Sequence, residues 1–423
     1  MKKIFYGWWI VLATNIICML GFGTWLYSFG VFFKPMSAEF GWTRAMTSGA
    51  YSFRNIQGGI ASPIAGWAVD KYGARIVIII GAIISGLSFC LMPFIKSIID
   101  FYLVYGILLS AGMSAMLYIP AWTVIAKWFK KHLSRALAVL ATGAGIGGFI
   151  CAPAAAYLIE HYGWRMAFVV FGVVIWIVVI PLAFLVKDNP EDMGLFIDGE
   201  NPDEAAQKEN EPREISGENN EPIPGQVDFT LKQALVSSSF WMLSLSFFFQ
   251  GVSHSTVTVH MVPALTDAGI SEARAAYGIG LLTSASIIGR LGFGYLGDYF
   301  SKRYLFIVTY LFMAAGMIVL MYTRTMDMVY LFVLLFGIGF GGNVPLMPGI
   351  RTEYFGRSAL GAIQGFMTPV MMLAGAIGPI FAGYIYDKTG SYHISFMVTG
   401  VLTFFAAVAI FFARPTLPRP LKR

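Results

Sequence analysis

Long apolar runs, each separated from the next by a short polar segment, recur along almost the whole chain. An α-helix needs about 20 apolar residues to cross a bilayer. The pattern therefore predicts twelve transmembrane helices, at residues 8–33, 46–69, 76–95, 101–125, 136–159, 165–187, 240–262, 274–297, 303–323, 328–350, 359–384 and 394–413. A chain built this way is expected to fold in lipid.

The composition agrees with a lipid-embedded chain. Hydrophobic residues make up 57% of it and charged residues 12%, whereas soluble domains carry about 25% charged residues. The net charge of +6 does not indicate nucleic-acid binding, because the basic residues lie between the apolar runs. Cys18, Cys90 and Cys151 lie in apolar stretches, which favours buried small side chains over a disulfide or metal site. We expect no metal and no cofactor.

The distribution of Lys and Arg predicts the orientation in the membrane. An even number of spans places both termini on one side, and most basic residues outside the spans, including Arg351, fall in segments on that side. Cytoplasmic loops of membrane proteins are enriched in Lys and Arg. The sequence therefore predicts a multi-pass protein of the cell inner membrane with both termini in the cytoplasm.

One long polar segment divides the chain. Residues 188–238 are rich in acidic residues and predict a cytoplasmic linker between an N-terminal bundle, 1–187, and a C-terminal bundle, 239–423. Three landmarks recur in order at nearly constant spacing in the two parts: the loop segments 66–75 and 294–303, Ala152-Pro153 and Gly378-Pro379, and Trp128-Phe129 and Tyr354-Phe355. This repetition predicts an all-α membrane protein of two pseudo-symmetric six-helix bundles.

The loop segments carry a family resemblance. The pattern G-x-x-x-D-K-x-G-x-R at 66–75 is similar to the signature of the major facilitator superfamily between its second and third helices, and 294–303 is a degraded second copy. The resemblance implies the major facilitator fold. It also implies gating roles for Asp70, Arg75 and Asp298, through charge pairs that hold one gate closed. The alternative is ordinary positive loop charge.

A narrower resemblance covers nearly the whole chain outside the linker. Residues 120–129, 135–138 and 143–147 are similar to the helix-four to helix-five signature of the monocarboxylate transporters and their bacterial relatives, which include oxalate–formate exchangers. Residues 6–9 and 32–35 resemble the first helix of the bacterial members. The resemblance implies a monomeric carrier whose partners are the lipid bilayer, a small carboxylate and a co-transported proton.

Two arginines lie inside predicted spans, where an ionisable residue is a functional candidate by default. Arg290 lies roughly 12 Å along its helix from Asp298, and the resemblance implies that it binds the substrate carboxylate. Arg54 lies about 12 Å nearer the outside, which is too far from Arg290 to clamp a two-carbon dicarboxylate unless helix tilt closes the gap. We weigh an outer gate or a hand-off site for Arg54 against a structural role, and a structural role for Arg290 against substrate binding.

Five further residues are candidates on their chemistry. Tyr27, Tyr118 and Asn343 are positioned to hydrogen-bond a carboxylate, the last two beside the helix-interrupting Pro120 and Pro345. Each is also explained by packing.

Tyr27 and Ser286 stand where animal monocarboxylate transporters carry Lys and Asp. Any proton must then use another group, and His254 and His260 titrate near physiological pH. The alternative for them is a hydrogen-bonded structural role.

These observations predict a secondary active transporter of small monocarboxylates, proton-coupled and working by alternating access. Two alternatives within transport remain open: an organic-anion exchanger of the oxalate–formate type and an efflux carrier for larger amphipathic compounds. A transporter-like membrane sensor is the non-transport alternative. The sequence offers no paired carboxylates, metal-ligand cluster or triad that would indicate an enzyme.

Overall fold

The computed structural model describes residues 5–130, 132–199, 229–356 and 360–413, and within these ranges it contains helices and no strands. The side chains of Tyr118 and Asp298 lie outside what it describes. The first part contains α1 (Tyr6–Phe22), the π-turn η1 (Gly23–Tyr27), α2 (Phe29–Phe40), α3 (Arg44–Tyr72), α4 (Ala74–Leu91), η2 (Met92–Phe94), α5 (Ile98–Phe101), η3 (Tyr102–Leu109), α6 (Ser110–Met116), α7 (Tyr118–Trp128), α8 (Leu133–Leu185), η4 (Pro190–Met193) and η5 (Ile197–Gly199).

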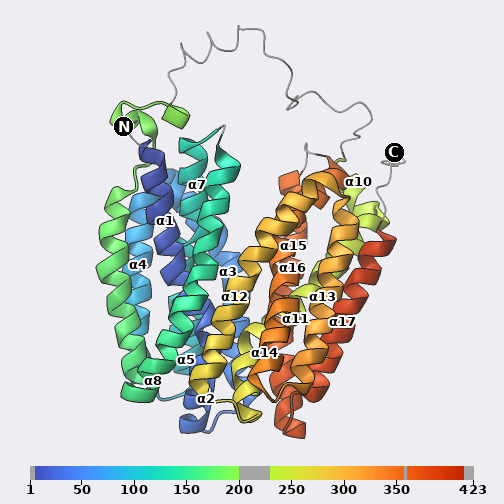
Figure 1. The fold of residues 1–423 in the computed structure, drawn as a ribbon. Coiled ribbons are helices and arrows are strands. Elements are labelled where there is room, and N and C mark those ends of the chain that lie inside the picture. The colour runs from blue at the N-terminus through green and yellow to red at the C-terminus, as the bar shows by residue number, and fades with distance from the viewer. Residues whose placement is uncertain (1–4, 131, 200–228, 357–359, 414–423) are drawn as a thin grey trace.

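The second part begins at residue 229 of the described chain. It contains α10 (Leu231–Val236), α11 (Ser238–Asp267), α12 (Glu272–Tyr299), α13 (Lys302–Tyr322), α14 (Met326–Phe332), η6 (Val333–Gly337), α15 (Ile338–Phe355), α16 (Leu360–Thr389) and α17 (His393–Phe412). Figure 1 shows the two parts side by side with their helices roughly parallel. We call them the N half and the C half.

Twelve membrane crossings follow from these elements within the described residues. The segments α1–η1–α2, α5–η3–α6–α7 and α14–η6–α15 each form one crossing. The long α8 supplies two, because its chain reverses at Gly163, where φ is 78° and ψ is 160°. A positive φ is readily adopted by glycine alone. The predicted all-helical, twelve-span fold is therefore confirmed.

Two of the crossings are unusually polar. Nine segments in the described part of the chain are long and apolar enough to span a membrane, with α8 counted once, and neither α3 nor α11 is among them. α3 carries Arg54, Asn55 and Gln57, and α11 carries His254 and His260. Both helices pack against α16, so these polar groups are shared with protein rather than presented to lipid.

The prolines act differently in the two halves. The helix breaks at Leu117, three residues before Pro120, because a proline ring clashes with the preceding turn; Leu117 has φ −93° and ψ −126°. The expected interruption at Pro345 and Pro348 is absent, since both lie inside the continuous α15. The loosened turn in that crossing is η6, which precedes them.

α1 begins and α17 ends at the same end of the molecule, the upper end of Figure 1. We call it the terminal end, and the opposite end the distal end. The halves meet through α3 against α16, α8 against α12, and α2 against α11. Glycines in α8 permit close approach: Gly147 faces α1, and Gly145 and Gly148 face α12.

We expect Gly147→Ala to lower the thermal stability of the purified protein. A Cβ there would lie 2.0 Å from the Met19 carbonyl oxygen, so the backbone of α1 or α8 must shift, at a cost of about 1–3 kcal/mol. The matched control is Gly292→Ala in α12, where nothing lies within 4 Å of the added Cβ. Melting curves in detergent test this, and equal melting temperatures for the two variants would refute the packing argument.

Candidate functional site

Arg290 lies where the two halves meet. It belongs to α12, is partly buried, and its Nη1 donates to the Ala141 carbonyl of α8 at 2.7 Å. Its Nε is buried without a hydrogen-bond partner among the described residues. A guanidinium has five donors in a fixed plane, so this arrangement leaves donors free for an anion.

Two of the other predicted residues lie beside Arg290. Tyr27 of η1 is 4% exposed and lies within hydrogen-bonding reach of the guanidinium. His254 of α11 interacts electrostatically with it, contacts the Thr258 hydroxyl at 3.3 Å and packs edge-on to Phe340. The structure thus brings together a cation, a phenol and an imidazole from both halves.

Arg54 occupies a separate aromatic environment in the N half. Its side chain is 3% exposed, and its guanidinium carbon lies 3.8 Å from the ring centre of Tyr51 and 4.3 Å from that of Trp25. The Tyr105 hydroxyl lies within hydrogen-bonding reach of this guanidinium. Tyr51 also lies near Tyr27, so the surroundings of the two arginines adjoin, although sequence spacing placed the arginines far apart.

Asn343 is not directed at this site. Its Oδ1 accepts from the Thr309 hydroxyl at 2.6 Å and its Nδ2 lies 3.2 Å from Met313 Sδ. It therefore ties α15 to α13 inside the C half. Tyr118 begins α7, directly after the break at Leu117, and its side chain lies outside the described part.

The predicted gating residues lie toward the terminal end. Arg75 Nε donates to the Val186 carbonyl at 2.9 Å, and the Ala74 amide donates to Asp188 at 2.5 Å. Both contacts stay within the N half. Asp70 is exposed near the end of α3, and Asp298 lies outside the described side chains.

Arg351, expected in a loop, is buried in α15 at 4% exposure beside Phe247 and Met371.

Polar contacts join the halves at the distal end, and sequence reasoning did not identify them. Asp267, at the end of α11, pairs with Lys34 and with Arg44 at 2.7 Å each. Asp387 of α16 accepts from the backbone amides of Arg44 and Ala45 at 2.9 Å, where it caps α3. Opposite charges at neighbouring loop ends were visible in the sequence, but their pairing depends on the packing.

His260 lies beneath these ion pairs and is fully buried. Its Nε2 lies 3.0 Å from the Ser48 hydroxyl and 2.9 Å from the Pro379 carbonyl, and its Nδ1 lies 2.9 Å from the Tyr392 hydroxyl. Tyr392 also accepts from Arg44 at 2.6 Å. Together Lys34, Arg44, Ser48, His260, Asp267, Asp387 and Tyr392 form what we call the distal network.

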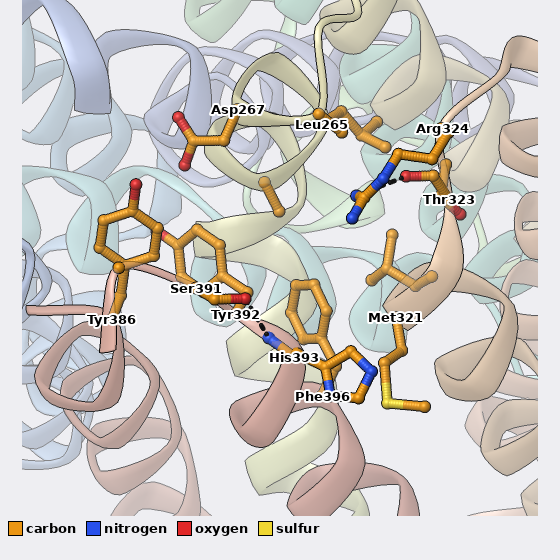
Figure 2. A pocket seen from close by; sticks show the side chains of 14 residues that line it. Leu265, Asp267, Met321, Thr323, Arg324, Tyr386, Ser391, Tyr392, His393 and Phe396 are labelled. Carbon is orange, nitrogen blue, oxygen red and sulfur yellow. Dashed lines mark hydrogen bonds between the residues drawn. The ribbon is translucent and has the colours of Figure 1, made fainter. Parts of the chain in front are cut away.

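A cavity of about 370 Å³ adjoins the distal network within the C half. Figure 2 shows Asp267 and Arg324 on opposite sides of it, with Tyr392 and His393 between them. Arg324 is exposed, and its Nη1 makes a 3.3 Å contact with the Thr323 carbonyl. The cavity is polar and lies at the distal surface, away from Arg290.

Comparisons with known proteins give a consistent family. A sequence model described as the Major Facilitator Superfamily matches residues 11–370 and 243–423. Human monocarboxylate transporter 12 is 27% identical over 96% of this chain and 81% of its own. The uncharacterised MFS-type transporter YcxA of Bacillus subtilis is 26% identical over 95% of this chain and 93% of its own.

A solved structure shares the fold. It is a bacterial homologue of the human lysosomal transporter Spinster, in an inward-facing and unoccupied conformation. The likeness has a TM-score of 0.73 and 19% identity, and it covers 98% of this chain and 97% of that one.

We expect Asp267→Asn to open the distal end, because a neutral amide cannot form ion pairs with Lys34 and Arg44. Partly exposed ion pairs contribute up to about 1 kcal/mol, so the open population should rise about fivefold. Spin labels at Ala38→Cys and Ser391→Cys, with the three native cysteines replaced by alanine, report the distance across this end.

Glu39→Gln is the control for the loss of an ion pair. Glu39 pairs with Arg165 at 2.6 Å entirely within the N half, so its loss should leave the distance distribution unchanged. A distribution for Asp267→Asn that matches wild type would show that the distal network does not hold the halves together.

Proposed function

The chain belongs to the Major Facilitator Superfamily, and we propose that it is a secondary transporter of small monocarboxylates in the cell inner membrane. As a member of that superfamily it is a multi-pass membrane transporter and not an enzyme. Its relatives named monocarboxylate transporters support the substrate class. The proposed organisation is a bundle at 1–187 and a bundle at 239–423 joined by a cytoplasmic linker.

Arg290 is the observation that carries the proposal. A cation inside a membrane protein is costly unless it is paired, and its neighbours Ala141, Tyr27 and His254 supply no negative charge. A carboxylate matches the planar donor fork of a guanidinium. Binding would neutralise the charge and bridge the halves, since Arg290 and His254 lie in the C half and Tyr27 in the N half.

Alternating access follows from where the halves are joined. The distal network closes one end by contacts that cross between the halves. If the termini are cytoplasmic, this is the state closed toward the outside. Occupancy of Arg290 would permit the halves to rock about the central site, as transporters built from two repeats do. We assign gating at the terminal end to Asp70, Arg75 and Asp298.

We assign the proton to His254. An anion on Arg290 would favour a protonated imidazole nearby, because opposite charges stabilise one another. His260 is held by three partners in the distal network, so we assign it to the closure of that end. Tyr118 remains the weaker member of the proposed binding set, and Asn343 is left out because Thr309 and Met313 engage its amide.

Anion exchange is the second candidate function. Ser286, one turn before Arg290, donates to the Thr283 carbonyl at 2.6 Å within its own helix. Neither Ser286 nor Tyr27 carries protons at neutral pH as the Lys and Asp of the animal family do. Uptake that requires the same anion on the opposite side of the membrane would favour exchange over proton symport.

We expect Arg290→Lys to reduce carboxylate uptake about 10–100-fold in kcat/KM, because a bidentate charge-assisted contact contributes about 1.5–3 kcal/mol. Uptake of radiolabelled formate, acetate, lactate and pyruvate into proteoliposomes measures it. Arg274→Lys, on the exposed distal part of the same helix, is the control and should transport normally. Normal uptake by Arg290→Lys would remove Arg290 from the binding role.

We expect His254→Gln to abolish the stimulation of uptake by an inward proton gradient while it preserves exchange of the same anion. Glutamine retains hydrogen bonding but does not titrate. The measurement compares gradient-driven uptake with counterflow at equal pH. If the pH gradient still drives uptake in this variant, His254 does not carry the proton.

A further inference from the structure

Arg54 and Trp25 present hydrogen-bond donors that have no acceptor. Arg54 Nε and Nη1 and Trp25 Nε1 are buried, and none has a hydrogen-bond partner in the part of the chain that the structure describes. The ion pairs found among the described residues do not include Arg54. Buried polar groups are almost always satisfied, so each exception needs an explanation.

Most of these unpaired groups are hydrogen-bond donors. Three donors, two of them on a guanidinium that is charged in every state, have no hydrogen-bond partner among the described residues. The polar group that does reach this guanidinium is the neutral Tyr105 hydroxyl. The Oε1 of Gln57, one turn along α3 from Arg54, is also buried and unpaired, and its amide can present either an acceptor or a donor. A set dominated by donors around a permanent cation is complementary to an anion.

The aromatic rings direct where an anion would bind. Tyr51 and Trp25 lie against the guanidinium at 3.8 and 4.3 Å, and such cation–π contacts use the face of the group. The N–H donors point outward in its plane. An acceptor is therefore expected at the edge of the guanidinium, where a planar carboxylate forms parallel hydrogen bonds.

This group is distinct from the surroundings of Arg290. Arg54 and Trp25 belong to the N half, whereas Arg290 belongs to the C half. Tyr51 contacts Arg54 and Tyr27 lies beside Arg290. Arg54 is ten residues from the distal start of α3, roughly 15 Å along the helix, and Arg290 is eighteen residues from the distal start of α12, roughly 27 Å. Arg54 is thus nearer the distal end.

We propose that Arg54 and Trp25 form a second anion subsite that holds a carboxylate separately from Arg290. The inference rests on the proposed carboxylate transport. An anion that enters from the distal side binds Arg54 first and then passes Tyr51 and Tyr27 to reach Arg290. The protein accordingly binds two monocarboxylates, and loss of the Arg54 subsite weakens uptake from the distal side more than from the terminal side.

Trp25→Phe provides the sharpest test, because it removes the Nε1–H donor and keeps an aromatic ring against Arg54. Loss of one donor to a charged acceptor should raise the distal-side KM about 5–10-fold, and Arg54→Gln should raise it about 10–100-fold, with little change in kcat. Uptake of radiolabelled lactate and pyruvate into vesicles of known, opposite orientation gives the KM from each side. Equilibrium dialysis of the same probes should give two sites for wild type and one for Arg54→Gln.

The outcomes separate this proposal from the proposed function. If Arg290→Lys loses uptake while Trp25→Phe and Arg54→Gln keep the wild-type KM on both sides and the wild-type stoichiometry, transport through Arg290 stands and the second subsite is wrong. If wild type neither binds nor transports the carboxylates, both fail. Should Arg54→Gln misfold, Trp25→Phe decides alone, since an unchanged distal-side KM in that variant overturns the subsite.

Discussion

The cost of placing a guanidinium in a low-dielectric interior shapes the centre of this transporter. Among the described residues, the neighbours of Arg290 and Arg54 are neutral, and both side chains retain unpaired donors. The protein reduces the cost of burial with a carbonyl from Ala141 and with aromatic faces at Arg54. No carboxylate in the described part of the chain pairs with either charge, which is the basis of the proposed anion binding.

The opposite arrangement holds the distal end. There Asp267 satisfies Lys34 and Arg44, and the buried His260 is hydrogen-bonded on both ring nitrogens. The ion-paired side chains are partly exposed, so water can replace their partners when the halves separate. The distal end is therefore closed by several contacts that are each weak. When this end opens, its charged side chains meet water and not hydrocarbon.

The sequence predicted the fold better than it predicted the contacts. The apolar runs located all twelve crossings, even the polar α3 and α11, because their flanking segments were clear. The structure places Arg290 beside Tyr27 and His254, and the binding roles predicted for these residues stay predictions. The distal network could not be derived, since Asp267 and Arg44 meet only through tertiary packing. Arg351 was misplaced in a loop because helix ends are poorly marked where glycine and proline are frequent, and Asn343 proved to be engaged within its own half.

The π-turn η1 gives the first crossing a particular vulnerability. Its wider turn accommodates one residue more than an α-helical turn does, and Ser28 closes it through its amide and hydroxyl to the Gly23 carbonyl. Trp25 and Tyr27 lie inside this turn, and Lys34 follows it in α2 of the same membrane crossing. Deletion of a single residue here would rotate the following part of the helix, including α2, by about 100° about its axis. Insertions and deletions in this stretch would thus displace the neighbours of both arginines and the Lys34 ion pair of the distal network in one event, which makes its length as constrained as its chemistry.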